Sequence, residues 1–308
     1  MHEHVVIGFP GWEADTLRSG PGRNEIIAVA VDKIQMMQDL GIQSMVDPCP
    51  NDLGRDVELS AEVSHRTGFN IVCATGLYHE SQGGSAHWSL LQSMGHAVEP
   101  MAELFIHEIS NGIGETGIKP GIIKVATGEG VITDYEYSVF EAAAIASCET
   151  GTPITTHTDQ GTMGQEQQAF LIEKGVPPHR IIIGHSCGSH DHHYHMDILQ
   201  RGSYLGFDRF GLDILTPDED RVKSLAALLQ KRREKQIVVS HDSVWCTRGE
   251  PLPKEMLSAI DPDKLFDPTH FHRNIIPQLL DAGAEQAQID TMLVENPRRF
   301  FSDDATAE

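Results

Sequence analysis

The chain opens with Met1-His2-Glu3-His4-Val5-Val6, in which two histidines stand two residues apart and run into an apolar segment. Because side chains alternate across a β-strand with a period of two, both imidazoles would lie on one face. Two imidazoles side by side can hold a divalent metal ion. A chain with 17 histidines also produces this spacing by chance, so the interpretation depends on residues further along.

The composition indicates a soluble globular protein, and its acidic balance favours either a small-molecule enzyme or a protein with a protein partner. The 308 residues are 40% hydrophobic and 22% charged, and the formal net charge is −22. An acidic surface repels nucleic acids and anionic membranes, so we expect neither as a partner. No apolar run approaches the length of a membrane span. Five scattered cysteines without a CxxC pair predict a reduced, cytoplasmic protein.

Eight short apolar segments alternate with amphipathic ones along the chain. After the opening strand, the predicted strands are 43–46, 70–75, 122–126, 153–158, 180–184, 203–208 and 237–240. The main helical patterns cover 24–40, 99–112, 134–150, 166–175, 217–233, 270–282 and 284–293. Thr216 is the expected N-cap of the pattern at 217–233, with Pro217 at the first helical position, and a long loop that contains Gly83, Gly84 and Trp88 is expected before residue 99. Continuous Ile/Val runs are typical of strands buried on both faces of a parallel sheet.

This alternation predicts an α/β fold, a (β/α)8 TIM barrel, with residues 1–308 as one domain. A doubly wound open sheet is the alternative. No GxGxxG follows the first strand, which counts against a dinucleotide-binding version of that fold.

Six polar residues stand at or near the C-terminal ends of predicted strands: His2, His4, Lys124, His157, His185 and Asp242. In a barrel these ends converge on one face, where the chemistry of this fold takes place. A lysine ammonium among metal ions is unfavourable, but a carbamate formed with carbon dioxide is an anionic ligand that can bridge two metals. Core histidines, and an ion pair between Lys124 and Glu129, are the alternatives for single positions. The convergence of all six favours a metal site.

The chain resembles the phosphotriesterase family of the amidohydrolase superfamily, and within it the phosphotriesterase-like lactonases. The matching segments cover nearly the whole chain in order: MHEHV (1–5), ATGLY (74–78), GIIKVATGEG (121–130), PITTHTDQG (153–161), IIIGHS (181–186), GSYLGFDRFGLD (202–213), VVSHD (238–242) and ENPRRFFS (295–302). The resemblance implies an amidohydrolase-type barrel. Relatives have a further segment upstream, so we expect strand one to be truncated at the N-terminus.

The resemblance also implies two divalent metal ions, with zinc expected first and cobalt, manganese or iron as alternatives. The more buried ion would be held by His2, His4 and Asp242, and the more exposed one by His157 and His185. Lys124, carboxylated to N6-carboxylysine, and a hydroxide would bridge both ions. The hydroxide would attack the substrate, and Asp242 would be the catalytic residue that takes up its proton. His241 should point away from the site on a regular strand.

The function implied by the resemblance is the opening of lactone rings, with N-acyl-homoserine lactones as substrates, quorum quenching as the role and promiscuous phosphotriesterase activity. Tyr78 and Arg209 follow the lactonase pattern and are the expected substrate-binding residues. The alternatives are an aromatic plug for Tyr78 and a salt bridge to Asp208 or Asp213 for Arg209. A homodimer is expected from the family.

Two alternative functions remain open on the sequence. One is an aryldialkylphosphatase or other carboxylic-ester hydrolase of the same fold. The other is a metal-binding barrel that is inactive because an N-terminal segment is missing. The histidine cluster His190–His195 is either an additional metal site or a solvated loop that caps a helix.

Overall fold

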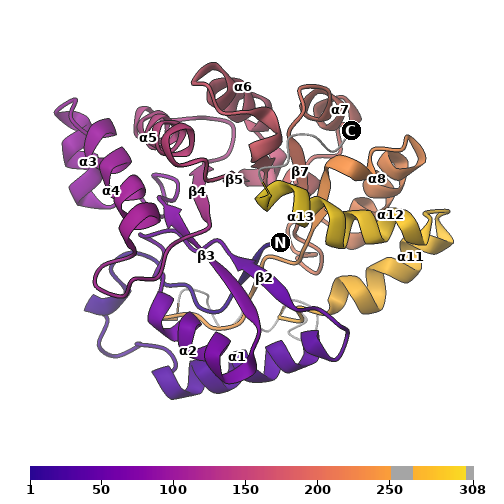
Figure 1. The fold of residues 1–308 in the computed structure, drawn as a ribbon, viewed down its shortest axis with the longest axis horizontal. Coiled ribbons are helices and arrows are strands. Elements are labelled where there is room, and N and C mark those ends of the chain that lie inside the picture. Colours follow the sequence, from indigo (N-terminus) through magenta and orange to yellow (C-terminus); the bar gives the residue numbers. More distant parts are fainter. Residues whose placement is uncertain (251–265, 303–308) are drawn as a thin grey trace.

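Parallel strands form the centre of the molecule, and helices surround them (Figure 1). The computed structural model describes residues 1–250 and 266–302. Each strand of the main sheet pairs in parallel with the next one along the chain, and all lie where the sequence predicts them. The sheet contains β2 (Ser44–Asp47), β3 (Asn70–Gly76), β4 (Ile122–Thr127), β5 (Ile154–Thr158), β6 (Ile181–Ile183), β7 (Tyr204–Phe207) and β8 (Ile237–Val239).

The opening strand β1 (Glu3–His4) lies between the two ends of this sheet. It pairs in parallel with β9 (Ser243–Val244), which follows β8, and the Trp245 N–H donates to His4 O at 2.9 Å. On its other side, the Val5 N–H donates to Asp47 Oδ2 at the end of β2, at 3.1 Å. The sheet thereby has the arrangement of a TIM-type fold. The truncation of strand one and the single domain over 1–308 stay predictions.

The helices lie on the outside of the sheet (Figure 1). They are α1 (Arg23–Gln38), α2 (Val57–Thr67), α3 (Ala86–Ser93), α4 (Val98–Asn111), α5 (Asp134–Thr150), α6 (Gly164–Glu173), α7 (His192–Gln200), α8 (Asp218–Gln230), α11 (Ile276–Asp281), α12 (Gln286–Asp290) and α13 (Asn296–Phe301). Within the described ranges, none of them combines the length and the apolar character needed to cross a membrane.

Two local predictions were wrong, and one helix was not predicted. Helix α3 falls in a segment expected to be loop, and it buries no residue, so it leaves no apolar period in the sequence. Helix α8 begins at Asp218 with Pro217 as its N-cap, rather than with Thr216 as the cap. The tail from residue 296 is helix α13, which continues from a π-helical turn, η7 (Thr291–Glu295).

The alternation of side chains along β4 shows how the fold places polar groups in the barrel. Ile123 and Val125 pack in the core shared with the helices, whereas Ile122 packs in a separate cluster that includes Phe300 of α13. Lys124 is therefore the next inward-facing residue after Ile122. An apolar layer at the start of the strands is followed by a polar layer near their C-terminal ends, as expected for a barrel with its site on that face.

Candidate metal centre

One cavity at the C-terminal ends of the strands brings together all the predicted ligands. It encloses about 420 Å³ that no atom fills, part of which is open to solvent. Its lining includes Tyr78 and the six predicted residues His2, His4, Lys124, His157, His185 and Asp242. The six predicted ligands lie on or close to five different strands, so only the folded chain can bring them together.

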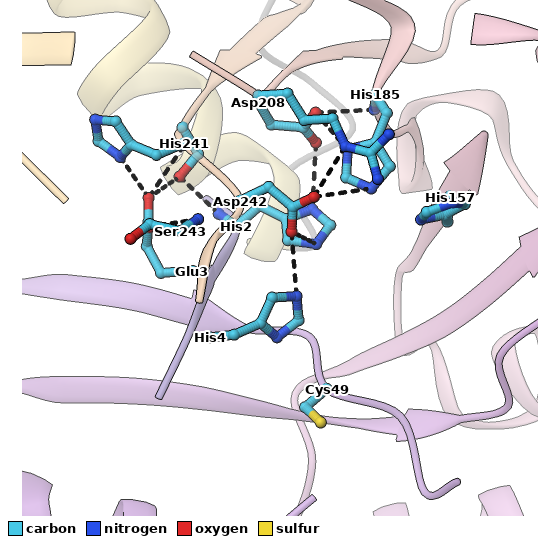
Figure 2. A network of polar contacts seen from close by, with 12 residues as sticks. His2, Glu3, His4, Cys49, His157, His185, Asp208, His241, Asp242 and Ser243 are labelled. Carbon is cyan, nitrogen blue, oxygen red and sulfur yellow. Dashed lines mark hydrogen bonds and ion pairs between the residues drawn. The ribbon is translucent and has the colours of Figure 1, made fainter. Parts of the chain in front are cut away.

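Asp242 lies at the centre of the cluster, with three imidazoles around it (Figure 2). Its Oδ1 is 3.4 Å from His2 Nε2 and 3.3 Å from His4 Nε2. Donors about 2.0–2.1 Å from a tetrahedral ion are separated by about 3.3 Å, so these distances suit a shared metal position. His185 Nε2, 3.7 Å from Asp242 Oδ2, is buried and has no hydrogen-bond partner. An orphaned imidazole nitrogen facing a carboxylate fits the requirements of a metal ligand.

Two buried carboxylates outside the cavity lining hold the rings of three histidines. Asp208 lies 3.3 Å from His2 Nδ1 and 3.0 Å from His185 Nδ1, through different oxygens. Asp47 lies 3.2 Å from His4 Nδ1. Such pairs fix the orientation of the ring and the nitrogen that faces the metal. Sequence reasoning missed both residues as site components, although each stands at the end of a predicted strand.

Lys124 is 1% exposed and lies among the histidines rather than beside a carboxylate. Its Nζ is 3.3 Å from His2 Nε2 and 3.5 Å from Thr156 O, so the alternative ion pair with Glu129 was wrong. Burial lowers the pKa of Lys124 to about 8, although the charges of Asp242 and Asp208 oppose this shift. A considerable fraction of the amine is then neutral near pH 7–8, the form that reacts with carbon dioxide.

The electrostatics of the cluster favour the protonation states that metal ligands need. Burial lowers the pKa of His2 to about 4 and that of His157 to about 3. Burial also lowers the pKa of His185, and the charge of Arg209 adds to the effect. Burial opposes ionisation of Asp242, but its neighbours His185, His2 and Arg209 outweigh burial and hold the pKa of Asp242 well below its usual value. Neutral imidazoles and an ionised carboxylate are the ligating forms.

His4 differs from the other ligands in its titration. Burial opposes its charged form, but hydrogen bonds to Asp242 and Asp47 outweigh burial and raise the pKa of His4 well above its usual value. A metal ion at His4 Nε2 would therefore displace a proton, so metal binding at this position competes with acid.

The backbone is strained at two of the predicted ligands. His185 has φ 56° and Asp242 has φ 53°, the left-handed region that residues with a Cβ rarely adopt. Each such residue costs on the order of 1–3 kcal/mol. His185 lies two residues after the end of β6 and Asp242 three residues after the end of β8, and in both places the turn directs the side chain into the cluster. Strain of this kind concentrates at functional sites.

The two expected substrate residues take different places. Tyr78 lines the cavity, and its hydroxyl lies 3.4 Å from His157 Nδ1. Arg209 donates from Nε to Asp242 Oδ2 at 2.9 Å, so the alternative pairing with Asp208 or Asp213 was wrong. Arg209 therefore contacts the predicted metal ligand Asp242, and its role as a substrate contact stays a prediction.

The remaining histidines lie outside the cavity. His241 Nδ1 donates to Glu3 Oε1 at 2.6 Å and its Nε2 accepts from the Phe271 N–H at 2.8 Å, so it points away from the cluster as expected. In the cluster at 190–195, His195 bonds Ser186 O and His192 contacts Lys231. Three groups of residues 1–250 and 266–302 have metal-binding geometry, and none includes this cluster.

A parallel α/β barrel with four imidazoles, a carboxylate and a buried lysine at one end defines a metal-dependent hydrolase. The chain belongs to the phosphotriesterase family, whose model matches residues 1–301. This family is metal-dependent, and the donor groups of the cavity agree with that property.

Individual relatives match almost the full chain. A phosphotriesterase homology protein of Mycobacterium tuberculosis is 36% identical over 98% of this chain and 92% of its own. The solved organophosphorus hydrolase of Deinococcus radiodurans is 38% identical, covers 98% of this chain and 91% of its own, and has a TM-score of 0.92. Another solved structure is described as the molecular engineering of organophosphate hydrolysis activity from a weak promiscuous lactonase template. It is 37% identical, covers 98% of this chain and 94% of its own, and has a TM-score of 0.92.

Proposed function

We propose that this hydrolase opens lactone rings, with N-acyl-homoserine lactones as the main substrates and phosphotriesters as a side activity. The observation that carries the proposal is the single cavity lined by all six predicted ligand residues and by Tyr78. The similarity to a structure obtained from a promiscuous lactonase template supports the same substrate class. An aryldialkylphosphatase is the second candidate, supported by the similarity to the organophosphorus hydrolase.

The proposed centre contains two divalent ions, and the nitrogen and oxygen donors suit zinc. His2, His4 and Asp242 would hold one ion, and His157 and His185 the other, with Lys124 as a bridging carbamate. Bound there, the ions would polarise the substrate oxygen and lower the pKa of a coordinated water. The neutral imidazoles and the partly neutral Lys124 agree with these roles.

Asp242 is the proposed proton acceptor. Its Oδ1 faces His2 and His4, whereas its Oδ2 accepts from Arg209 Nε at 2.9 Å. Arg209 thus orients the carboxylate and keeps it ionised before the reaction. Asp242 would take the proton of the attacking water and deliver it to the alkoxide that leaves as the ring opens.

The rest of the cavity wall supports the proposed class of substrate. Apolar side chains also line the cavity: Phe9 and Leu53 from loops, and Val244 from β9. Such a wall suits an apolar substituent beside the reacting ester. Tyr78 adds a hydroxyl next to the more exposed metal position, where it can donate to a carbonyl oxygen. A cytoplasmic homodimer with neither nucleic acid nor membrane as partner completes the proposal, on the basis of the family and the net charge of −22.

The test is a side-by-side assay of metal-reconstituted protein with its metal content measured on the same sample. The panel contains acyl-homoserine lactones of graded chain length, simple γ- and δ-lactones, and paraoxon. We expect about two metals per chain and lactone turnover that exceeds paraoxon turnover by orders of magnitude. Preferential paraoxon turnover would favour the aryldialkylphosphatase. Bound metal without turnover of any ester would favour a metal-binding barrel that is not an enzyme for these substrates.

A further inference from the structure

One carboxylate beside the cavity differs from the others that contact the ligand histidines. Asp159 Oδ1 lies 2.7 Å from His157 Nε2, which is shorter than the contacts of Asp47 and Asp208 with the other predicted ligand histidines. Asp159 is 31% exposed, whereas the side chains of Asp47 and Asp208 are 7% and 2% exposed. Of these three carboxylates, Asp159 is thus the one that faces solvent, and it contacts the histidine proposed for the more exposed ion.

The contact depends on a specific turn after β5. Residues Asp159–Gly161 form a short helical turn in which Gln160 has φ 50°. The Asp159 carbonyl accepts from both the N–H and the hydroxyl of Thr162, at 2.9 and 2.7 Å. Gly161 has φ 67°, and a Cβ there would lie 2.5 Å from the Ser189 nitrogen. The turn is therefore held from two sides, and it directs Asp159 back onto the ring two residues earlier.

The two nitrogens of His157 face different surroundings. Nε2 faces Asp159, and Nδ1 lies 3.4 Å from the Tyr78 hydroxyl, on the cavity side. A carboxylate can only accept, so the proton of a neutral His157 belongs on Nε2 and the lone pair on Nδ1. That lone pair is what a metal ion needs. The His79 ring, 1% exposed, lies 5.5 Å from the His157 ring and limits its rotation.

We propose that Asp159 is a positioning residue for the more exposed metal ion, because it fixes the tautomer and the ring plane of His157. The proposal rests on the binuclear centre proposed above and adds a residue to it. Its consequence is an asymmetry between the two ions. Buried Asp208 contacts one histidine of each ion, and buried Asp47 contacts His4, whereas only the ion at His157 and His185 also depends on a carboxylate that water and salt can reach.

The experiment compares zinc retention in the wild-type chain and in Asp159→Asn and Asp159→Ala. Each protein is loaded with zinc and titrated with a chelator, and cobalt-loaded samples are followed by visible absorption. We expect Asp159→Ala to lose one of its two ions at a free-zinc level about 10–100-fold higher than the wild type does. Asp159→Asn should fall between them, since its amide oxygen still accepts from Nε2 without the charge. The second ion should be retained equally in all three.

The matched control is Asp197→Asn, an exposed aspartate on α7 that contacts Gln165. It should titrate like the wild type, and the urea midpoints of all variants show whether they are folded. Superimposable curves for Asp159→Ala and the wild type would overturn the proposal. A wild type with three ions, of which Asp159→Ala loses the third, would also overturn it, because Asp159 would then be a ligand together with His79 and His157. A wild type that binds fewer than two ions would instead remove the binuclear centre itself.

Discussion

Asp242 carries more of the proposed chemistry than any other side chain of the cluster. One oxygen faces two imidazoles and the other accepts from Arg209, so the carboxylate is fixed at both ends. The sequence alone singled out Asp242 and the other predicted ligands because they stand at or near the ends of predicted strands. It did not identify Asp47, Asp208 or Asp159, whose importance comes from contacts with histidines that lie elsewhere in the fold.

Replacing Asp242 by Asn should lower kcat for lactones by about 10²–10⁴-fold, because the amide cannot accept the proton of the attacking water. The assay should use saturating zinc, so that weaker binding of the metal does not limit the rate. Asp281→Asn, at an exposed position on α11, is the control and should behave like the wild type. Wild-type rates in Asp242→Asn would remove this residue from the mechanism.

Replacing Lys124 by Ala should lower the number of bound metal ions, because the proposed bridging carbamate is lost. Formate or acetate should restore part of the metal and of the activity, since a small carboxylate can occupy the space left by the side chain. Lys124→Met fills that space without an oxygen ligand, so it should lose metal and resist rescue. Full metal occupancy in Lys124→Ala without added carboxylate would contradict a bridging role.

At the level of elements, a buried ion pair joins the loop after β2 to helix α4. Arg55 contacts both oxygens of Glu108 at 2.8 Å, and Glu108 Oε2 also accepts from Thr75 Oγ1 at 2.6 Å. The same loop carries Leu53, which lines the cavity. Sequence periodicity predicted α4, with its start at 99 instead of 98, but not the partner of Glu108. An ion pair between two elements depends on how they dock, which no local pattern records.

We expect Glu108→Gln to lower the free energy of unfolding by about 3 kcal/mol at pH 7, because Arg55 would stay buried without its charge partner. Burial opposes ionisation of Glu108, but the Arg55 contact outweighs it and lowers the pKa below the usual value. Because the pKa of Glu108 is lower in the folded state, its ionised form stabilises the fold at pH values above the unfolded pKa of 4.5. This stabilisation is lost as the pH falls through the folded pKa. The difference between variant and wild type should therefore shrink below about pH 4.5.

Urea unfolding at a series of pH values measures this difference. Glu103→Gln, an exposed position on the same helix, is the control and should change stability by less than about 0.5 kcal/mol at every pH. A penalty for Glu108→Gln that is constant from pH 7 to pH 3.5 would show that packing, rather than charge, accounts for the loss.

At the scale of the whole molecule, the site exists only when the first and last strands of the barrel meet. His2 and Asp208 are 206 residues apart in the sequence, and the Asp242 N–H donates to His2 O at 3.0 Å. The alternation of apolar segments predicted the order of the strands, and the fold class predicted that the site lies at their C-terminal ends. Helix α3 and the N-cap of α8 could not be predicted in this way, because an exposed helix and a loop contact leave no periodic signal in the sequence.

The left-handed backbone at His185 and Asp242 has a consequence for how this sequence would change under different pressures. Glycine is the residue that such backbone angles prefer, so glycine would relieve the backbone strain at each of these positions. At Asp242 this gain would be offset, because Arg209 would stay buried without its charge partner. Selection for thermal resistance alone, in a laboratory library without an activity screen, should therefore enrich glycine at His185 rather than at Asp242. Library members that retain His185 and Asp242 under an added activity screen would show directly how much stability this protein exchanges for its chemistry.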